Sequence, residues 1–374
     1  MKRFIAVLLI AVLLVGCGKQ APTTEAEPGT APSTAATEPT TLPAIEETEP
    51  PTEATEPEPT EPPVIRHPLT GEVLDTPYTG HATAVVVNNI IDCQPQHGIS
   101  DADIFYEVET EGGITRNLAI FTDLENADKI GPIRSARTYF NALARSYQAP
   151  LVHCSAGLPA RDGYVDNYVT KLSNWEHVDA GAFGTAYFYR DSQRLAQGFA
   201  QEHTLFSTGE KLLNVLAYKE YDKVNENGLD FGLQFAEAPV MAGDAATKVK
   251  VTFMGSKTTS FAYDAETGLY TASQYGGTHK DGNTGEAVTY RNVMALYVNH
   301  TKADVYYAYR SFYDLVGSGE GHMACDGKII PIKWSHASYE DPFVYTLEDG
   351  TPLQLGVGRT YIGITGASDP ISYK

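Results

Sequence analysis

The segment from Ala21 to Pro63 has a composition that rules out a packed core. It holds half of the chain's 22 prolines and ten glutamates, but no lysine or arginine. Thr-Glu-Pro units recur along it, starting at Thr37, Thr48, Thr55 and Thr60. Such a segment buries too little apolar surface to offset the entropy lost on ordering. We therefore expect residues 17–65 to be an extended, solvated tether and the folded part of the chain to follow it.

The first residues predict export and lipidation. A basic start, Lys2-Arg3, precedes an apolar run over residues 4–15, and Cys17 follows directly after Leu-Val-Gly. This is the pattern of a lipoprotein signal peptide, and the apolar run is shorter than the roughly 20 residues of a bilayer span. We predict a signal peptide over residues 1–16 and a lipid on Cys17. The protein is then anchored to the cell membrane on its extracytoplasmic face, with an uncleaved signal anchor as the alternative.

The charge of the folded part argues against nucleic acid as a partner. Removing the ten tether glutamates and the three N-terminal basic residues leaves 37 acidic and 24 basic residues, a balance of about −13. Binding to phosphate backbones needs a basic face. A single local cationic pocket is still compatible with this balance.

Hydrophobic patterning predicts a mixed α/β domain over residues 66–240. Strands are expected at residues 82–88, 104–108, 114–122 and 151–153, and helices after Ser135 and at residues 160–172 and 210–218. Gly112-Gly113 favours a hairpin between the second and third strands, with Glu107, Glu109 and Glu111 on one face. Ser135 is the expected N-cap of the first helix.

Residues 241–374 predict a second, β-rich domain. Alternation begins at Lys248, and Asp326-Gly327 has the composition of a hairpin turn. Gly317, Gly319 and Gly321 lack the strand-turn-helix context of a phosphate loop, so hairpin glycines are the preferred interpretation. Trp334, Tyr339 and Tyr345 are expected in the core, with a sugar-stacking surface as the alternative.

A series of motifs in the first domain resembles the DUF3048 family of lipoproteins. The motifs are Val86-Val87-Asn88-Asn89, Gln94-Pro95-Gln96, residues 98–104 (Gly-Ile-Ser-Asp-Ala-Asp-Ile), Tyr106-Glu107, residues 111–116 (Glu-Gly-Gly-Ile-Thr-Arg), residues 130–137 (Ile-Gly-Pro-Ile-Arg-Ser-Ala-Arg) and, more weakly, residues 202–206 (Glu-His-Thr-Leu-Phe). In the second domain, residues 317–321, Gly327-Lys328 and Ile332-Lys333-Trp334 are similar to the family's C-terminal region. The resemblance implies a lipoprotein with two domains, but it implies no particular reaction.

A dense set of charged residues in the first domain is the main candidate site. It comprises Asp101, Asp103, Glu107, Glu111, Arg116, Arg134 and Arg137. One interpretation is that these groups pair with one another. The other is that the arginines bind a phosphate or carboxylate, as guanidinium groups do well. The ligand-binding residues are then Arg116, Arg134, Arg137, Asn89 and Ser135, and the ligand is a phosphorylated or carboxylated glycan or a lipid-linked precursor of the cell envelope.

Two alternatives to ligand binding follow from the same residues. The chain could be an envelope enzyme with Glu107 or Asp103 as acid, base or metal ligand, or an interaction module with a protein partner at the membrane. The histidines and cysteines lack zinc-site spacing, no Gly-x-Ser-x-Gly motif occurs, and no cofactor is indicated. Cys93, Cys154 and Cys325 are left after Cys17, and either a Cys93–Cys154 disulfide or three unpaired thiols fits the sequence.

Overall fold

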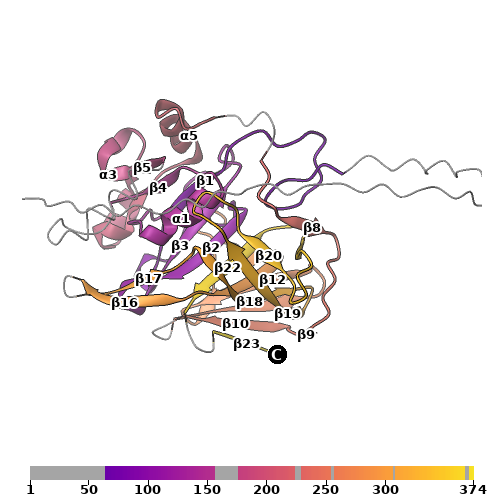
Figure 1. The fold of residues 1–374 in the computed structure, drawn as a ribbon. Helices are drawn as coiled ribbons and strands as arrows, with labels where there is room; N and C mark the ends of the chain where they lie inside the picture. Colours follow the sequence, from indigo (N-terminus) through magenta and orange to yellow (C-terminus); the bar gives the residue numbers. More distant parts are fainter. Residues whose placement is uncertain (1–63, 156–175, 224–228, 254–256, 306–307, 367–369) are drawn as a thin grey trace, which may run out of the picture. The chain divides into compact units, whose positions relative to one another are not determined.

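Strands from both halves of the chain join one large mixed sheet (Figure 1). The computed structural model describes residues 64–155, 176–223, 229–253, 257–305, 308–366 and 370–374. These described residues all fall within one compact unit. The sheet has the order β20 (Val344–Thr346), β19 (Lys328–His336), β18 (Gly317–Cys325), β15 (Asn292–Tyr297), β22 (Thr360–Thr365), β2 (Ile104–Glu109), β3 (Thr115–Phe121), β1 (Thr83–Asn89), β4 (Leu151–His153) and β5 (His177–Asp179), and β9 (Asp244–Ala245) pairs with β19.

A second sheet has the order β13 (Gly277–Thr278), β12 (Leu269–Gln274), β11 (Thr258–Asp264), β10 (Lys248–Thr252) and β23 (Ile371–Tyr373), and β14 (Thr289–Tyr290) pairs with β12. The short strand pairs are β16 (His300–Val305) with β17 (Ala308–Tyr313), β8 (Gln234–Ala236) with β21 (Gln354–Gly356), and β6 (Tyr189–Arg190) with β7 (Leu205–Phe206). The described helices are α1 (Thr138–Ser146), α3 (Ala180–Phe183), α4 (Ser192–Ala196) and α5 (Gly209–Tyr218), and short 3-10 turns occupy Ile91–Cys93, Glu111–Gly113, Gly184–Ala186 and Gln201–His203. Strands dominate the described residues.

The large sheet is covered on both faces, which explains its continuous apolar strands. One face packs on α1 through a core that includes Tyr106, Leu118 and Phe140. The other face packs on the second sheet through a core that includes Phe105 and Phe261. All seven residues of β1 are buried, as expected for a central strand, whereas β10 alternates between exposed lysines and buried valines because only one of its faces is covered.

The secondary structure agrees with the sequence prediction in most of the first region. Strands β1 to β4 lie where the pattern places them, and α5 matches the helix expected at residues 210–218. The helix expected at residues 160–172 lies outside the described residues. The prediction that Ser135 caps the first helix is wrong, because α1 begins at Thr138 with Arg137 in the N-cap position and no side-chain cap. The α/β character of this region is only partial, because its helices are few.

The second region is β-rich as predicted, but its strands are interleaved with those of the first. β22 runs parallel to both β2 and β15, so a strand from near the end of the chain lies between strands from its two halves. Asp326-Gly327 forms the expected hairpin between β18 and β19. Gly317, Gly319 and Gly321 lie along β18, and Trp334 and Tyr345 are buried, in agreement with a core role for both aromatic residues.

No helix among the described residues combines the length and apolarity that crossing a membrane requires.

Candidate functional site

The β2–β3 hairpin divides the predicted polar residues between the two faces of the large sheet. In the strand register Arg116 lies opposite Val108 and Asn88, on the face that packs on α1. Glu107 lies on the other face, where it contacts Thr259 of β11. The prediction that Glu107, Glu109 and Glu111 share one face of the hairpin is wrong for Glu111, because this residue turns in a 3-10 segment toward the α1 side.

Two buried arginines converge on one carboxylate. Arg116 Nη2 lies 3.2 Å from Glu111 Oε1, and Arg137 donates from Nε to Glu111 Oε2 at 2.9 Å and from Nη2 to Oε1. Arg116 also donates to the backbone oxygen of Ser135 at 2.9 Å, and Arg137 to that of Ala136 at 2.6 Å. Both side chains are more than nine-tenths buried, so this part of the cluster is in large measure satisfied by the protein itself.

Arg134 is the most accessible of the three arginines. Its side chain is 25% exposed and pairs at 3.0 Å with Glu202, whose side chain is 52% exposed. Glu202 adjoins His203, whose Nδ1 lies 2.9 Å from the side-chain amide of Asn88 at the end of β1. We call Arg116, Arg134 and Arg137, with Glu111 and Glu202, the arginine cluster.

The arginine cluster brings like charges close together. Among the described residues, three guanidinium groups pair with two carboxylates. Burial and the neighbouring charges of Arg137 and Arg134, opposed by Glu111, lower the pKa of Arg116 to about 10. Burial acts to raise the pKa of Glu111, but Arg137 and Arg116 outweigh it and hold that pKa well below its ordinary value. The like charges therefore repel one another at a site with little water to screen them.

Two donors in the cluster have no partner within the described part of the chain. They are the buried Nε groups of Arg116 and Arg134. A buried donor without a hydrogen bond costs free energy, and such groups are rare in folded proteins. The cluster thus has two buried donors without a hydrogen-bond partner among the described residues.

Glu107 belongs to a separate, buried network between the two sheets. Lys257 Nζ lies 3.0 Å from its Oε1, which also accepts from Asn89 at 3.0 Å and from Thr115 at 2.6 Å. Its other oxygen accepts from Thr259 at 2.7 Å and from Tyr361 at 2.8 Å. Burial acts to raise the pKa of Glu107, but Lys257 and the hydroxyl donors outweigh it and lower the pKa below its ordinary value. Glu107 is thus an ionised, fully bonded carboxylate.

Asp103 lies at a third place, just before β2. Its Oδ2 accepts from the backbone amide and the hydroxyl of Thr122, both at 2.7 Å. It lines a hollow of about 660 Å³ together with His67 and Tyr78, and its burial raises its pKa. Glu107 is four positions along the chain from Asp103, roughly 13 Å in a strand, so the two carboxylates cannot act on one reacting atom.

Of the five predicted ligand-binding residues, four lie together and one does not. Arg116, Arg134, Arg137 and Ser135 form or border the arginine cluster, whereas Asn89 donates to Glu107 and Thr115 on the other face. Sequence reasoning missed two charged partners. Glu202 stands in a motif of the family resemblance, which was a usable signal, but nothing in the pattern around Lys257 points to Glu107, which lies far away in the sequence.

The cysteines are unpaired in the described part of the chain. Cys93, Cys154 and Cys325 are free thiols, and Cys93 donates from Sγ to the backbone oxygen of Ile90 at 3.0 Å. The alternative of a Cys93–Cys154 disulfide is therefore not what the structure has. In the described ranges no three His, Cys, Asp or Glu side chains are grouped as a metal site would require.

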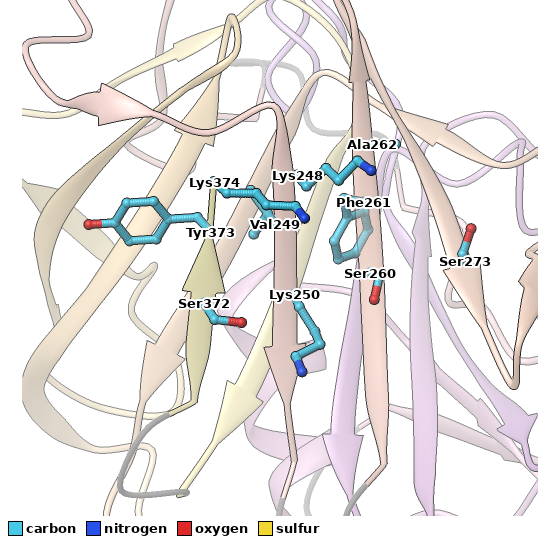
Figure 2. Close-up of a pocket in the computed structure, with 10 residues that line it drawn as sticks. All are labelled: Lys248, Val249, Lys250, Ser260, Phe261, Ala262, Ser273, Ser372, Tyr373 and Lys374. Carbon is cyan, nitrogen blue, oxygen red and sulfur yellow. The ribbon is translucent and has the colours of Figure 1, made fainter.

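A lysine-rich groove lies on the outer face of the second sheet (Figure 2). Ser372, Lys250, Ser260 and Ser273 are aligned by the strand register and form a row across β23, β10, β11 and β12. Lys248 and Lys374 flank this row, and the hollow has a volume of about 540 Å³. None of the three ammonium groups is ion-paired with a described residue, although the protein as a whole is strongly acidic.

Comparison with known proteins agrees with the family resemblance that the sequence motifs indicate. A family model described as the N-terminal domain of a protein of unknown function (DUF3048) matches residues 69–222, and the model of the DUF3048 C-terminal domain matches residues 249–362. YerB of Bacillus subtilis (strain 168), which is named as a lipoprotein, is 27% identical over 318 residues, covering 82% of this chain and 90% of YerB. The crystal structure of YerB from Bacillus subtilis superposes with a TM-score of 0.69 at 26% identity, covering 83% of this chain and 99% of that one. The chain belongs to the DUF3048 family.

Proposed function

We propose that this protein is held at the extracytoplasmic face of the membrane by a lipid on Cys17 and binds an anionic ligand of the cell envelope through the arginine cluster. The ligand class is a phosphorylated or carboxylated glycan, either free or carried on a lipid-linked precursor. The single observation that carries the proposal is that Arg134, 25% exposed, is paired with a half-exposed glutamate, while its Nε and that of Arg116 have no partner among the described residues. The lipoprotein name of the relative YerB supports the membrane attachment.

Arg134 is the residue proposed to contact the ligand. Its partner Glu202 is half exposed, and ion pairs of that kind are worth little, about 0–1 kcal/mol. An arriving phosphate or carboxylate can replace Glu202 and accept two parallel N–H bonds from the guanidinium fork. Arg116 and Arg137 lie behind it, fixed by Glu111, and contribute a positive field rather than direct contacts.

The test is retention of the soluble folded part on purified envelope material. Arg134→Gln should weaken binding about tenfold or more, as expected for loss of a charge-assisted, bidentate contact. Arg66→Gln is the matched control, because Arg66 is 27% exposed and also pairs with one exposed glutamate, Glu237. Arg137 is unsuitable as a test position, because its replacement removes hydrogen bonds to the partly buried Glu111 carboxylate and so affects folding as well as binding.

Three separate binding assays distinguish the sources of the anion. They use phosphorylated wall polymer, carboxylated polymer and vesicles that hold a lipid-linked precursor. Weaker binding of Arg134→Gln to any of them, with Arg66→Gln unchanged, supports the proposal. Equal binding of both variants and the parent to all three contradicts it. In that case an interaction with a membrane protein, detectable by crosslinking in cells, is the function to pursue.

An enzyme that uses Glu107 has less support. The carboxylate is buried and accepts from five partners, and its lowered pKa is the reverse of what a general acid needs. Divalent-metal-dependent release of product from a lipid-linked precursor, lost in Glu107→Gln, would be required to revive this alternative.

A further inference from the structure

A third hollow, which none of the three clustered arginines lines, lies beside the tip of the β12–β13 hairpin. It has a volume of about 550 Å³, and its wall includes Ile91, Gln94 and Pro95 from the loop after β1 and Gln274 and Tyr275 from the hairpin. The two sides come from the first and second regions of the chain. The hollow is therefore formed only in the folded whole.

Tyr275 occupies the hairpin tip in an unfavourable backbone conformation. Its φ is 52° and that of Gly276 is 81°, the pair of positive values that a type I′ turn requires. Asn-Gly is the favoured sequence there, and a positive φ is costly for a bulky aromatic residue. Such strain is found where function requires a particular side chain. Here it keeps an aromatic ring, 37% exposed, on the wall of the hollow.

The ring is fixed from behind. The hydroxyl of Tyr275 donates to the backbone oxygen of Asn89 at 2.6 Å, and Lys257 Nζ lies 4.7 Å from the ring centroid. Lys257 is in turn the partner of Glu107. The buried ionic network therefore holds the ring in one position. Because the ring is already ordered, little side-chain entropy is lost when a ligand stacks against it.

Gln274, which lines the same hollow, holds a buried hydrogen-bond donor without a partner among the described residues. Its Oε1 accepts from Lys257 at 2.9 Å, and an ammonium can only donate, so the orientation of the amide is fixed. Its Nε2 is then left without a hydrogen-bond partner among the described residues, although the residue is only 7% exposed. The side-chain oxygen of Gln94 likewise accepts no hydrogen bond from the described part of the chain. Donor and acceptor amides thus border an aromatic ring.

Asp281 and Lys280, one acidic and one basic residue, give the wall no formal net charge that would favour an ionic ligand. Asp281 accepts from the backbone amides of Gly98, Ser100 and Asn283 and is satisfied. Burial lowers the pKa of His279 to about 4, so this residue is neutral. Lys280 is the remaining charged group on the wall. An aromatic face, neutral amides and glycines are the chemistry that stacks on the C–H face of a sugar and bonds to its hydroxyls.

We propose that the hollow between the hairpin tip and the loop 91–95 is a binding site for a neutral sugar unit, with Tyr275 as the stacking platform and Gln274 and Gln94 as hydroxyl partners. This site is independent of the arginine cluster. The sequence offered Trp334, Tyr339 and Tyr345 as an alternative sugar-stacking surface, but Trp334 and Tyr345 are buried and Tyr339 is partly buried against the same core. The proposed sugar site lies elsewhere, at Tyr275.

The probes are methyl glycosides of glucose, galactose and N-acetylglucosamine, with cellobiose and chitobiose, tested by saturation-transfer NMR and by ¹⁵N–¹H shift titration. Tyr275→Ala should weaken binding about tenfold, whereas Tyr275→Phe keeps the ring and should bind within about threefold of the parent. Gln274→Glu keeps the acceptor for Lys257 but removes the free donor, so it should also weaken binding. Tyr218→Ala, an exposed tyrosine on α5, is the control and should bind as the parent does.

Thermal unfolding of each variant verifies that it folds. If Tyr275→Ala fails to fold, Tyr275→Phe and Gln274→Glu still test the proposal on their own. No binding of any probe to the parent overturns the proposal, and so does equal binding by the parent, Tyr275→Ala and Gln274→Glu. Arg134→Gln should bind sugars normally, so failure here and failure of the anion site are separable.

Discussion

Glu107 and Arg116 are diagonal neighbours on β2 and β3, yet their side chains leave opposite faces of the large sheet. One residue of register separates them, because Arg116 pairs with Val108. Alternation then directs Glu107 to the second sheet and Arg116 toward α1. What the sequence presents as one polar cluster is an internal ion pair on one face, and on the other a group of arginines that pair with Glu111 and Glu202.

The Glu107–Lys257 pair should be essential to stability. Glu107→Gln leaves the Lys257 ammonium buried without its counter-charge, and this should lower the free energy of unfolding by about 3–5 kcal/mol in urea titrations. The double variant Glu107→Gln with Lys257→Met should recover much of the loss, because no uncompensated charge remains. Glu202→Gln, at an exposed pair, should cost no more than about 1 kcal/mol. Equal losses in the single and double Glu107 variants would contradict this assignment.

Stability should decline as the pH falls from about 6.5 to about 4. Burial lowers the pKa of His279 to about 4, below its ordinary value of 6.5, so the unfolded chain binds the proton first. A depressed folded pKa contributes stability above the unfolded value that is lost as the pH falls through the folded one. Burial also lowers the pKa of His97 to about 4, so His97 contributes to the same loss of stability.

The measurement is the urea midpoint across this range, with histidine ring shifts followed by NMR. His279→Gln should flatten the decline. A His279 ring that titrates near 6.5 in the folded protein would disprove the prediction.

A second acidic window lies lower on the pH scale. The pKa values of Glu107 and Glu111 are both held below the ordinary glutamate value of 4.5, so their contribution is complete above that value and is lost as the pH falls further. Acid unfolding of the parent should steepen below pH 4.5. Glu111→Gln should be less stable at pH 7 but lose less on acidification, and an unchanged acid slope in this variant would count against the Glu111 part of the argument.

The thiols should differ in reactivity. Burial raises the pKa of Cys93 and of Cys325 to about 12, and both are buried, whereas Cys154 is half-buried. In the native soluble part, a thiol reagent should label Cys154 first and the other two only after unfolding. Reducing agent should leave the melting temperature unchanged. A melting temperature that falls on reduction would indicate a disulfide instead.

The lysine-rich groove should contribute to binding of polyanions. Lys248→Gln with Lys250→Gln should weaken retention on phosphodiester polymer and reduce its dependence on salt, because screened charge contacts are removed. Lys328→Gln, an exposed lysine at the start of β19, is the control. Retention that is unchanged in the double variant at low salt would eliminate the groove as a contact surface.

Local pattern is enough to predict β1 to β4 and α5, because each has a clear apolar period and a recognisable end. It is not enough to predict which face Arg116 takes relative to Glu107, since one residue of register decides this. The partners of these residues were harder still. Lys257 contacts Glu107 only because the second sheet packs on the first. The two residues are 150 positions apart in the sequence (257 minus 107). The Tyr275 hollow has the same origin, because its two walls are distant in the chain.

The position of β22 has a consequence for folding. This strand, Thr360–Thr365, fills the gap between β2 and β15, so the middle of the sheet lacks its central member until these residues have been made. Sequence-distant pairing of this kind is slow to form. The two parts of the sheet that flank β22 therefore become continuous only late in folding, when this strand pairs with both of them.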